Sequence, residues 1–187
     1  MNRLRQVPTE ALKTQAWANG AGITTEIACG PGDAWRWRLS IAEITQACEF
    51  SSFPATRRQF VALDAPVRLR FAPERELSLL RLQTILFDGA EAPYISLPEG
   101  ATRAFNLMLR DDAQGELIAR PLTGAMWLPA RASWRWFVHV LSGHAGIQVN
   151  DEHAEFVAGA NVWIDAQPGE RLRVEGGGEL LLVHLAT

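Results

Sequence analysis

The sequence has 187 residues, of which 48% are hydrophobic and 21% are charged, proportions that are ordinary for a globular protein. Its net charge is −3, with 18 basic and 21 acidic residues, which gives no electrostatic basis for binding nucleic acid. The first residues lack the apolar core of a signal peptide, and no run of about 18 apolar residues is present to span a membrane. We therefore expect a cytoplasmic protein with neither a nucleic-acid nor a membrane partner.

The first half of the chain is predicted to contain one short helical segment followed by strands. Residues 9–16 have a composition compatible with one or two helical turns. Residues 35–44 alternate in character, with tryptophan, leucine and isoleucine on one face and Arg38 and Ser40 on the other. Further strands, separated by turns that contain Pro and Asp, are predicted over 59–63, 67–71 and 77–87.

The second half repeats this rhythm after a polar connector at 110–121. Turn signals containing Gly, Pro, Asn or Asp recur about every ten residues, a spacing typical of sandwiches and barrels. The strands predicted here cover 134–141, 145–149, 154–157, 162–164, 172–174 and 180–185. The whole chain is therefore predicted to be all-β.

Two segments of the second half, Val140–Ile147 and Gly159–Ile164, resemble the two hairpins of a cupin barrel. Metal-binding cupins carry two histidines and a glutamate before the first glycine, and a further histidine after the second hairpin. The corresponding positions here include Ala130, Trp136 and Leu172, whose side chains do not bind metal ions. We therefore expect no metal and no other cofactor.

The histidines and cysteines support the same expectation, because none of them shows a metal-binding spacing. His184 lies in an apolar segment and is predicted to be a core histidine with its hydrogen bonds satisfied. His139 shares a strand face with Leu141 and is a candidate for a pocket. Cys29 and Cys48 are expected to be reduced thiols.

The most specific motif is in the first half and reads Trp17-Ala-Asn-Gly-Ala-Gly-Ile-Thr-Thr-Glu-Ile. Glycines at 20 and 22 allow a bend or a close backbone approach. Asn19 and Glu26 add polar groups beside the tryptophan, a combination typical of a small-molecule site. A hairpin with a capped turn would have a similar composition, so the motif alone does not decide between the two.

The motif and four later segments together resemble the HutD/Ves family over essentially the whole chain. The later segments are Trp37-Arg-Leu-Ser-x-Ala, Phe50-Ser-x-Phe-Pro, Arg58 and Asn106-Leu-Met. The sequence departs from the family pattern at Ala21, Ala55, Arg57 and Ala104, and the acids lost among them make the local charge more positive.

The resemblance implies a bicupin, which is two cupin-type antiparallel β-barrels or jelly rolls packed in one compact unit. We place the N-terminal barrel at 1–110 and the C-terminal barrel at 111–187, with strands exchanged between the halves. The resemblance also implies a regulator that binds a small acidic intermediate of histidine breakdown. Other family members are described only as stress-induced, and no catalytic activity is attached to the family.

A small carboxylate would be bound by Arg38 and Arg58, because guanidinium pairs with carboxylate through two hydrogen bonds. Glu26 would either bind a nitrogen of the ligand or hold one of the arginines in place. Neutral polar side chains would add hydrogen bonds, and aromatic side chains, Phe53 included, would form apolar walls. The predicted ligand-binding residues are Trp17, Asn19, Glu26, Arg38, Ser40, Phe50, Arg58 and Asn106.

Three functions are compatible with these features. The first is a HutD/Ves-like small-molecule-binding protein with no catalytic residue. The alternative is a metal-independent isomerase or lyase that uses Glu26 or His139 as its general base. The third is an interaction protein that recruits a partner through an exposed aromatic patch of Trp134, Trp136 and Trp163. A homodimer is compatible with each of them.

Overall fold

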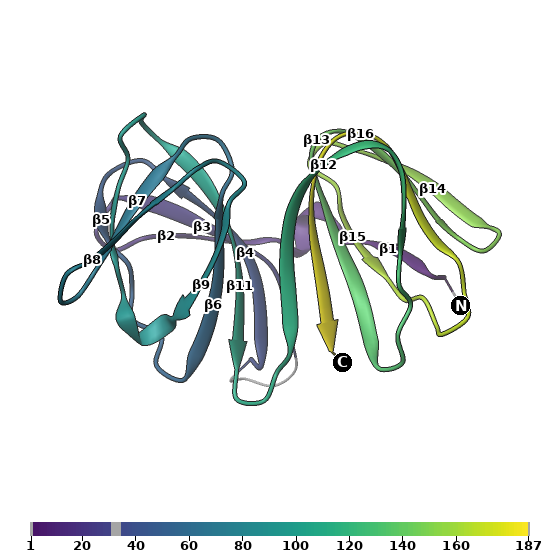
Figure 1. The fold of residues 1–187 in the computed structure, drawn as a ribbon, viewed down its shortest axis with the longest axis horizontal. Helices are drawn as coiled ribbons and strands as arrows, with labels where there is room; N and C mark the ends of the chain where they lie inside the picture. Colours follow the sequence, from purple (N-terminus) through teal and green to yellow (C-terminus); the bar gives the residue numbers. More distant parts are fainter. Residues whose placement is uncertain (1, 31–34, 187) are drawn as a thin grey trace. The chain divides into compact units, whose positions relative to one another are not determined.

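The computed structural model describes residues 2–30 and 35–186, which are almost entirely β-structure (Figure 1). Adjacent strands in this part of the chain pair antiparallel. The chain forms two compact units: residues up to Thr9 join those from Gln114 onward in unit 1, and Glu10–Ala113 form unit 2. The prediction of an all-β protein is therefore confirmed.

Unit 2 is built from two sheets. The large sheet has the strand order β2 (Lys13–Ala16), β3 (Gly22–Cys29), β4 (Trp37–Ile44), β11 (Thr102–Arg110), β6 (Thr56–Ala62) and β9 (Thr84–Asp88). The small sheet has the order β5 (Cys48–Glu49), β10 (Tyr94–Ser96), β7 (Val67–Phe71) and β8 (Arg75–Leu79), and a short 3-10 helix, η2 (Gly89–Glu91), precedes β10. Phe60 and Ala104 from the large sheet share one buried cluster with Leu69 and Ile95 from the small sheet, so the two sheets pack face to face.

The central strand β4 is buried on both of its faces. Trp37 and Leu39 are buried on one face, and Ser40 and Ala42 are buried on the other. The alternation read from the sequence is therefore present, but it does not separate a core face from a solvated one. Instead it separates two buried faces, and Arg38 lies on the inner one with Ser40.

Unit 1 is built from a single sheet of long, bent strands. Its order is β1 (Leu4–Gln6), β15 (Asn161–Ile164), β13 (Trp134–Val149), β16 (Leu172–Ala186) and β12 (Gly115–Leu128), and β14 (Glu152–Val157) pairs with β13. The three longest strands, β12, β13 and β16, bend near their middles (Figure 1). Gly143 faces Gly178 at this bend, where a Cβ on Gly178 would lie 2.0 Å from the Ser142 carbonyl oxygen, so only glycine fits.

The cupin-type barrels expected from the sequence are not closed in the described residues, because all three sheets are open. The large sheet of unit 2 ends in β2 and β9, and the sheet of unit 1 ends in β1 and β12. Unit 1 buries its core by bending one sheet over itself, and unit 2 does so by packing two sheets together. Neither arrangement needs hydrogen bonds between edge strands to remove apolar side chains from water.

Two local predictions are confirmed only in part. Residues 9–16 form only the 3-10 turn η1 (Thr9–Ala11) before the edge strand β2, whose four residues are all exposed. A helix there would have no apolar face to bury, whereas β2 gains backbone hydrogen bonds by pairing with β3. Residues 110–121 are not a connector throughout, since β12 begins at Gly115.

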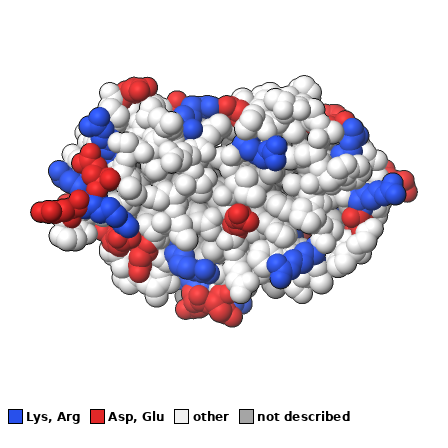
Figure 2. Space-filling model, viewed as in Figure 1, with Lys and Arg blue, Asp and Glu red and all other residues white. Residues whose placement is uncertain are grey.

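The surface of the described residues carries charges of both signs. On the face shown in Figure 2, basic and acidic side chains are interspersed, in line with the nearly balanced composition. Among the described residues, no helix has the length and apolar character required to cross a membrane.

Candidate functional site

Unit 2 contains a cavity of about 470 Å³, a volume within the range of small-molecule sites. Its walls come from β2 and the turn after it, from the central strands of the large sheet, and from β5 and the segment that follows β5. Seven of the eight predicted ligand-binding residues line it: Trp17, Asn19, Arg38, Ser40, Phe50, Arg58 and Asn106. The eighth, Glu26, is not part of the lining.

Cross-strand pairing explains how residues far apart in the sequence meet in this cavity. Met108 on β11 pairs with Arg38 on β4 and with Arg58 on β6. Asn106, two residues earlier on β11, pairs with Ser40. Directly paired residues point to the same face of a sheet, so these side chains form two adjacent rows on the inner face of the large sheet.

Arg58 is a buried cation in aromatic surroundings. Its side-chain Nε donates a 2.8 Å hydrogen bond to Asn106 Oδ1. Its guanidinium carbon lies 4.4 Å from the ring centre of Phe50, 5.5 Å from that of Phe87 and 5.9 Å from that of Phe60. Across residues 2–30 and 35–186, no carboxylate forms an ion pair with it.

Burial, and after it the positive charge of Arg38, lowers the pKa of Arg58 to about 9. The two Nη atoms of Arg58 have no hydrogen-bond partner in the described part of the protein. Because arginine can only donate, the Asn106 atom that faces it is Oδ1, and the Nδ2 donor of Asn106 is therefore left for the cavity. The site thus offers several hydrogen-bond donors around an uncompensated positive charge.

Arg38 differs from Arg58 because it has an acidic partner. Its Nε donates a 2.7 Å hydrogen bond to Glu26 Oε2, and the two side chains are only 17% and 20% exposed. Glu26 lies on β3, opposite Ser40 in the β3–β4 register. This arrangement matches the second role predicted for Glu26, which is to hold an arginine in place.

The Trp17 motif forms a tight turn that closes one wall of the cavity. Trp17 Nε1 donates a 2.7 Å hydrogen bond to Thr24 Oγ1, and the Trp17 backbone N–H donates to the Gly22 carbonyl at 2.9 Å. The Asn19 side-chain oxygen accepts from the Ala21 N–H at 3.0 Å. The asparagine and the glycines therefore shape the turn, and the tryptophan ring is fixed by its own hydrogen bond.

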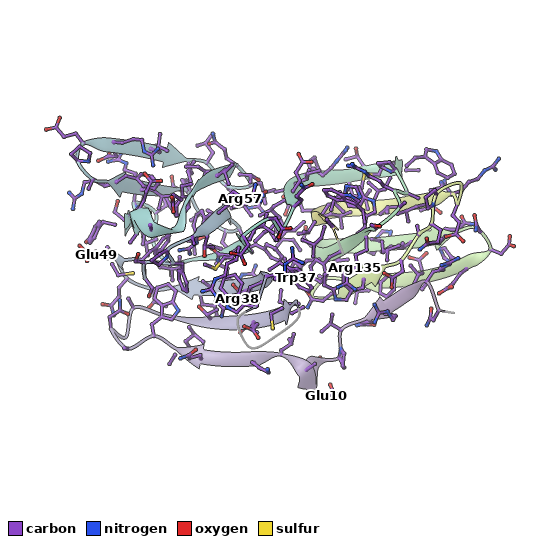
Figure 3. The ribbon with its side chains drawn as sticks, turned by 90° about the horizontal axis from the view of Figure 1, so that it is seen from below. Glu10, Trp37, Arg38, Glu49, Arg57 and Arg135 are labelled. Carbon is purple, nitrogen blue, oxygen red and sulfur yellow. The ribbon has the colours of Figure 1, made fainter. Side chains whose placement is uncertain are left out.

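Eight lining residues were not selected from the sequence. They are Gln15, Ala16, Ala18, Thr24, Ala42, Glu49, Ser51 and Met108. Ala42 and Met108 could have been found, because each is two residues from a predicted site residue on the same strand face. Glu49 gave no such signal, since it comes from the small sheet, whereas Arg38 comes from the large one (Figure 3).

In unit 1, Trp136 occupies the position where the resemblance to metal-binding cupins would place a glutamate. Trp136 is buried, its Nε1 donates a 2.9 Å hydrogen bond to the Pro129 carbonyl, and its ring stacks on His184 with 4.2 Å between ring centres. No group of three His, Cys, Asp or Glu side chains in the described part of the chain is placed to hold an ion. These side chains do not fit the metal site of a cupin.

Two histidines of unit 1, His139 and His184, are at least partly buried. His139 is buried, with Nδ1 2.9 Å from Asn161 Oδ1, and it does not line the cavity of unit 2. Asn161 Nδ2 donates to the Gly159 carbonyl, so Oδ1 is the acceptor and His139 Nδ1 carries the proton. His184 is half-buried, and burial lowers its pKa. Its Nε2 has no hydrogen-bond partner among the described residues, whereas the sequence predicted a histidine with its hydrogen bonds satisfied.

The predicted aromatic patch is not exposed. Trp136 and Trp163 are buried, and Trp134 is partly buried, with its ring tilted by 42° against that of His184 at 4.6 Å between ring centres. Trp127 on β12 is the exposed tryptophan, at 62%. The three residues proposed for partner recruitment therefore do not form the surface that this function requires.

The HutD family model matches residues 9–182, which include every residue of the cavity. The chain belongs to the HutD family. The resemblance read from the Trp17 motif is thus confirmed.

Two relatives show how far the similarity to individual HutD and Ves sequences extends. An uncharacterized 21.2 kDa protein in the hutC 3′ region of Pseudomonas putida is 32% identical over 112 residues, which is 58% of this chain and 59% of that protein. Protein Ves of Cronobacter sakazakii is 35% identical over 142 residues, covering 73% of this chain and 74% of that protein. The chain therefore spans about three fifths of the length of the first relative and three quarters of the second.

Solved structures agree on the fold. The structure of HutD from Pseudomonas fluorescens SBW25 matches with a TM-score of 0.78 and 24% identity, over 98% of this chain and 100% of that one. A cupin 2 conserved barrel domain protein from Leptotrichia buccalis matches with a TM-score of 0.58 and 12% identity, over 94% and 96% of the two chains. At such identities the likeness shows a cupin-like fold and nothing about ligands.

Proposed function

We propose that this HutD-family protein binds a small acidic metabolite in the cavity of unit 2, without a metal ion. The observation that carries the proposal is Arg58, a buried guanidinium with no acidic partner among the described residues and with both Nη atoms unoccupied. Burying a charge without a partner costs several kcal/mol. A side chain held at that cost, and lining a cavity, is well suited to binding an anion from solution.

The groups around Arg58 favour a carboxylate. The Nη atoms of Arg58 present two parallel donors that fit the two oxygens of a carboxylate. Asn106 Nδ2 and the terminal nitrogens of Arg38 add donors, and Ser40 on the neighbouring row adds a hydroxyl. Trp17, with the phenyl rings of the lining, gives an apolar wall for the rest of the ligand.

The biological role that we propose is regulation, in histidine utilisation or in a stress response. Support comes from membership of the HutD family and from the name of the Pseudomonas putida relative, which places that protein in the hutC 3′ region. No residue is assigned a catalytic role. A homodimer and a cytoplasmic location remain part of this proposal.

We also propose that units 1 and 2 each correspond to one half of a bicupin. Each unit has its own buried cluster and its own antiparallel sheet structure, as a cupin half would. The cupin-like neighbours support this assignment at the level of the fold.

The metal-independent isomerase or lyase has less support than the binding function. Glu26 is ion-paired with Arg38 and does not line the cavity. His139 belongs to unit 1 and is hydrogen-bonded to Asn161. Neither candidate base is placed beside a ligand in the cavity of unit 2.

Calorimetric titration tests the binding function directly. The purified protein would be titrated with histidine, urocanate, N-formylglutamate and simpler carboxylic acids, before and after dialysis against a chelator. We expect saturable binding of at least one acid and no effect of the chelator. Flat titrations for the whole set, with protein that is folded by circular dichroism, would contradict the proposal.

The affinity for an anion is expected to depend on pH through Arg58. In the free protein this group is protonated below about pH 9 and neutral above it, because its folded pKa is lowered. A bound anion favours the protonated form, so binding above pH 9 must take up a proton. We expect a constant dissociation constant from pH 6.5 to pH 8, and a rise approaching tenfold per pH unit above about 9. An affinity that stays flat between pH 8 and pH 10.5 would show that Arg58 keeps its proton throughout this range, and the expected pH dependence would be wrong.

A further inference from the structure

The two arginines of the cavity differ in how their charges are balanced. Glu26 neutralises Arg38 through a hydrogen bond at 2.7 Å, in a setting where both side chains are less than one quarter exposed. Arg58 has no such partner in the described chain. The inner end of the cavity therefore carries one net positive charge although two guanidinium groups line it.

Glu26 achieves this neutralisation without occupying the cavity. It lies on β3, paired with Ser40 of β4, and binds the Nε edge of the Arg38 guanidinium. The terminal nitrogens of Arg38 have no other protein partner among residues 2–30 and 35–186, so they remain able to donate to a ligand. Glu26 thus changes the charge that a ligand experiences without removing the donors of Arg38.

The open end of the cavity has the opposite charge. Glu49 on β5 lines the cavity and is exposed, whereas Arg58 on β6 is buried. A ligand whose carboxylate reaches Arg58 shares the cavity with the carboxylate of Glu49. A second carboxylate on that ligand would meet a negative side chain at one end and only one net positive charge at the other.

We infer that Glu26 is a specificity-determining residue that matches this cavity to ligands with a single carboxylate. The inference rests on the proposed function and deepens it by naming the charge of the ligand. An additional ionised carboxylate in the cavity would be repelled by Glu26 and Glu49 together. Two unit charges several ångströms apart at a partly buried site interact strongly enough to change an affinity about tenfold.

The test compares two acids with the same carbon chain, pentanoate with one carboxylate and glutarate with two. Their dissociation constants would be measured by calorimetry for the wild-type protein and for Glu26→Gln. Glutamine keeps an oxygen that can accept from Arg38 Nε, so the position of Arg38 is retained while the negative charge is removed. We expect the wild type to prefer pentanoate, and the ratio of the two affinities to shift toward glutarate by about tenfold in Glu26→Gln.

Glu91→Gln is the matched control. Glu91 also forms an ion pair with an arginine, Arg75, at 2.6 Å, but it does not line the cavity, and glutamine can retain its capping role in η2. This variant should keep the wild-type affinity ratio, and a shift equal to that of Glu26→Gln would overturn the inference. Glu26→Ala is the second variant: it also removes the negative charge, so it should shift the ratio toward glutarate, and it decides the matter if Glu26→Gln does not fold.

The outcomes separate this inference from the function on which it rests. If neither acid nor any other carboxylate binds the folded wild type, the proposed function is wrong. If acids bind the wild type but a folded Glu26→Gln protein keeps the wild-type ratio, the binding function stands and the inference about Glu26 is overturned.

Discussion

Replacing Arg58 with methionine is expected to abolish anion binding and to leave the folded protein at least as stable as the wild type. Removing one partner of a buried charge pair costs about 3 kcal/mol of binding energy or more, which corresponds to a hundredfold or greater loss of affinity. In the free protein, however, the same substitution removes a buried charge that has no acidic partner in the described chain.

The local packing favours this outcome. The guanidinium is surrounded by the rings of Phe50, Phe60 and Phe87. The sulfur of a methionine at this position would also make favourable contacts with these rings. The cost is the lost donor to Asn106 Oδ1, about 1–3 kcal/mol for a buried acceptor left unpaired. Relief of the unpaired charge is of similar size or larger, so the melting temperature should be unchanged or raised.

Arg70→Met is the matched control for this experiment. Arg70 is exposed on β7, lies 5.0 Å from the Tyr94 ring centre, and does not line the cavity. It should leave both affinity and melting temperature close to the wild-type values. A strongly destabilised Arg58→Met protein would mean that Arg58 is a structural residue, and full retention of binding would place the anion elsewhere.

Gly22→Ala is expected to be strongly destabilising, whereas Gly20→Ala is expected to cost only about 1 kcal/mol. A Cβ on Gly22 would lie 2.3 Å from the Glu43 carbonyl oxygen and 3.2 Å from the Trp17 ring, so the backbone must move. Gly20 has a φ of +69°, but a Cβ at this position would have no other atom within 4 Å, so alanine there meets only the intrinsic cost of the left-handed region.

Urea unfolding of the two variants would measure this difference. We expect Gly22→Ala to lose about 3 kcal/mol of unfolding free energy and to weaken ligand binding, because the Trp17 wall shifts with the turn. Gly20→Ala should keep the wild-type affinity. Equal losses in the two variants would show that the motif needs its glycines for conformation alone and not for the close approach of β3 to β4.

The sequence predicted the class of the fold because strand alternation and turn residues are local properties. The strand predicted at 67–71 matches β7. Its five residues alternate between buried and exposed, and a short alternating segment between two turns buries its apolar side chains on one face as a strand. The region 77–87 was predicted as one strand but forms β8 and β9 in different sheets, with Leu82 at a φ of +61° between them. Such a break depends on which strands are available for pairing, and that is not a local property.

Strand length in unit 1 was underestimated for a related reason. The segments 134–141 and 145–149 form one strand, β13, in which Gly143 is a bend and not an end. A glycine in a strand pattern is read as a turn when its partner is unknown. Only the pairing with Gly178 on β16 shows that the ladder continues across it.

By itself, the sequence determined the family, the all-β class and most of the candidate site. Rare polar and aromatic residues at fixed spacing identify a motif even when the residues that contact it in the folded protein are unknown. The tertiary structure decided how those residues act. Arg38 and Arg58 are equivalent in the sequence, but the register of β3 with β4 gives Arg38 a carboxylate, while the burial of β6 leaves Arg58 without one in the described chain. Charge balance depends on neighbours brought together from different strands, and only the folded sheet fixes those neighbours.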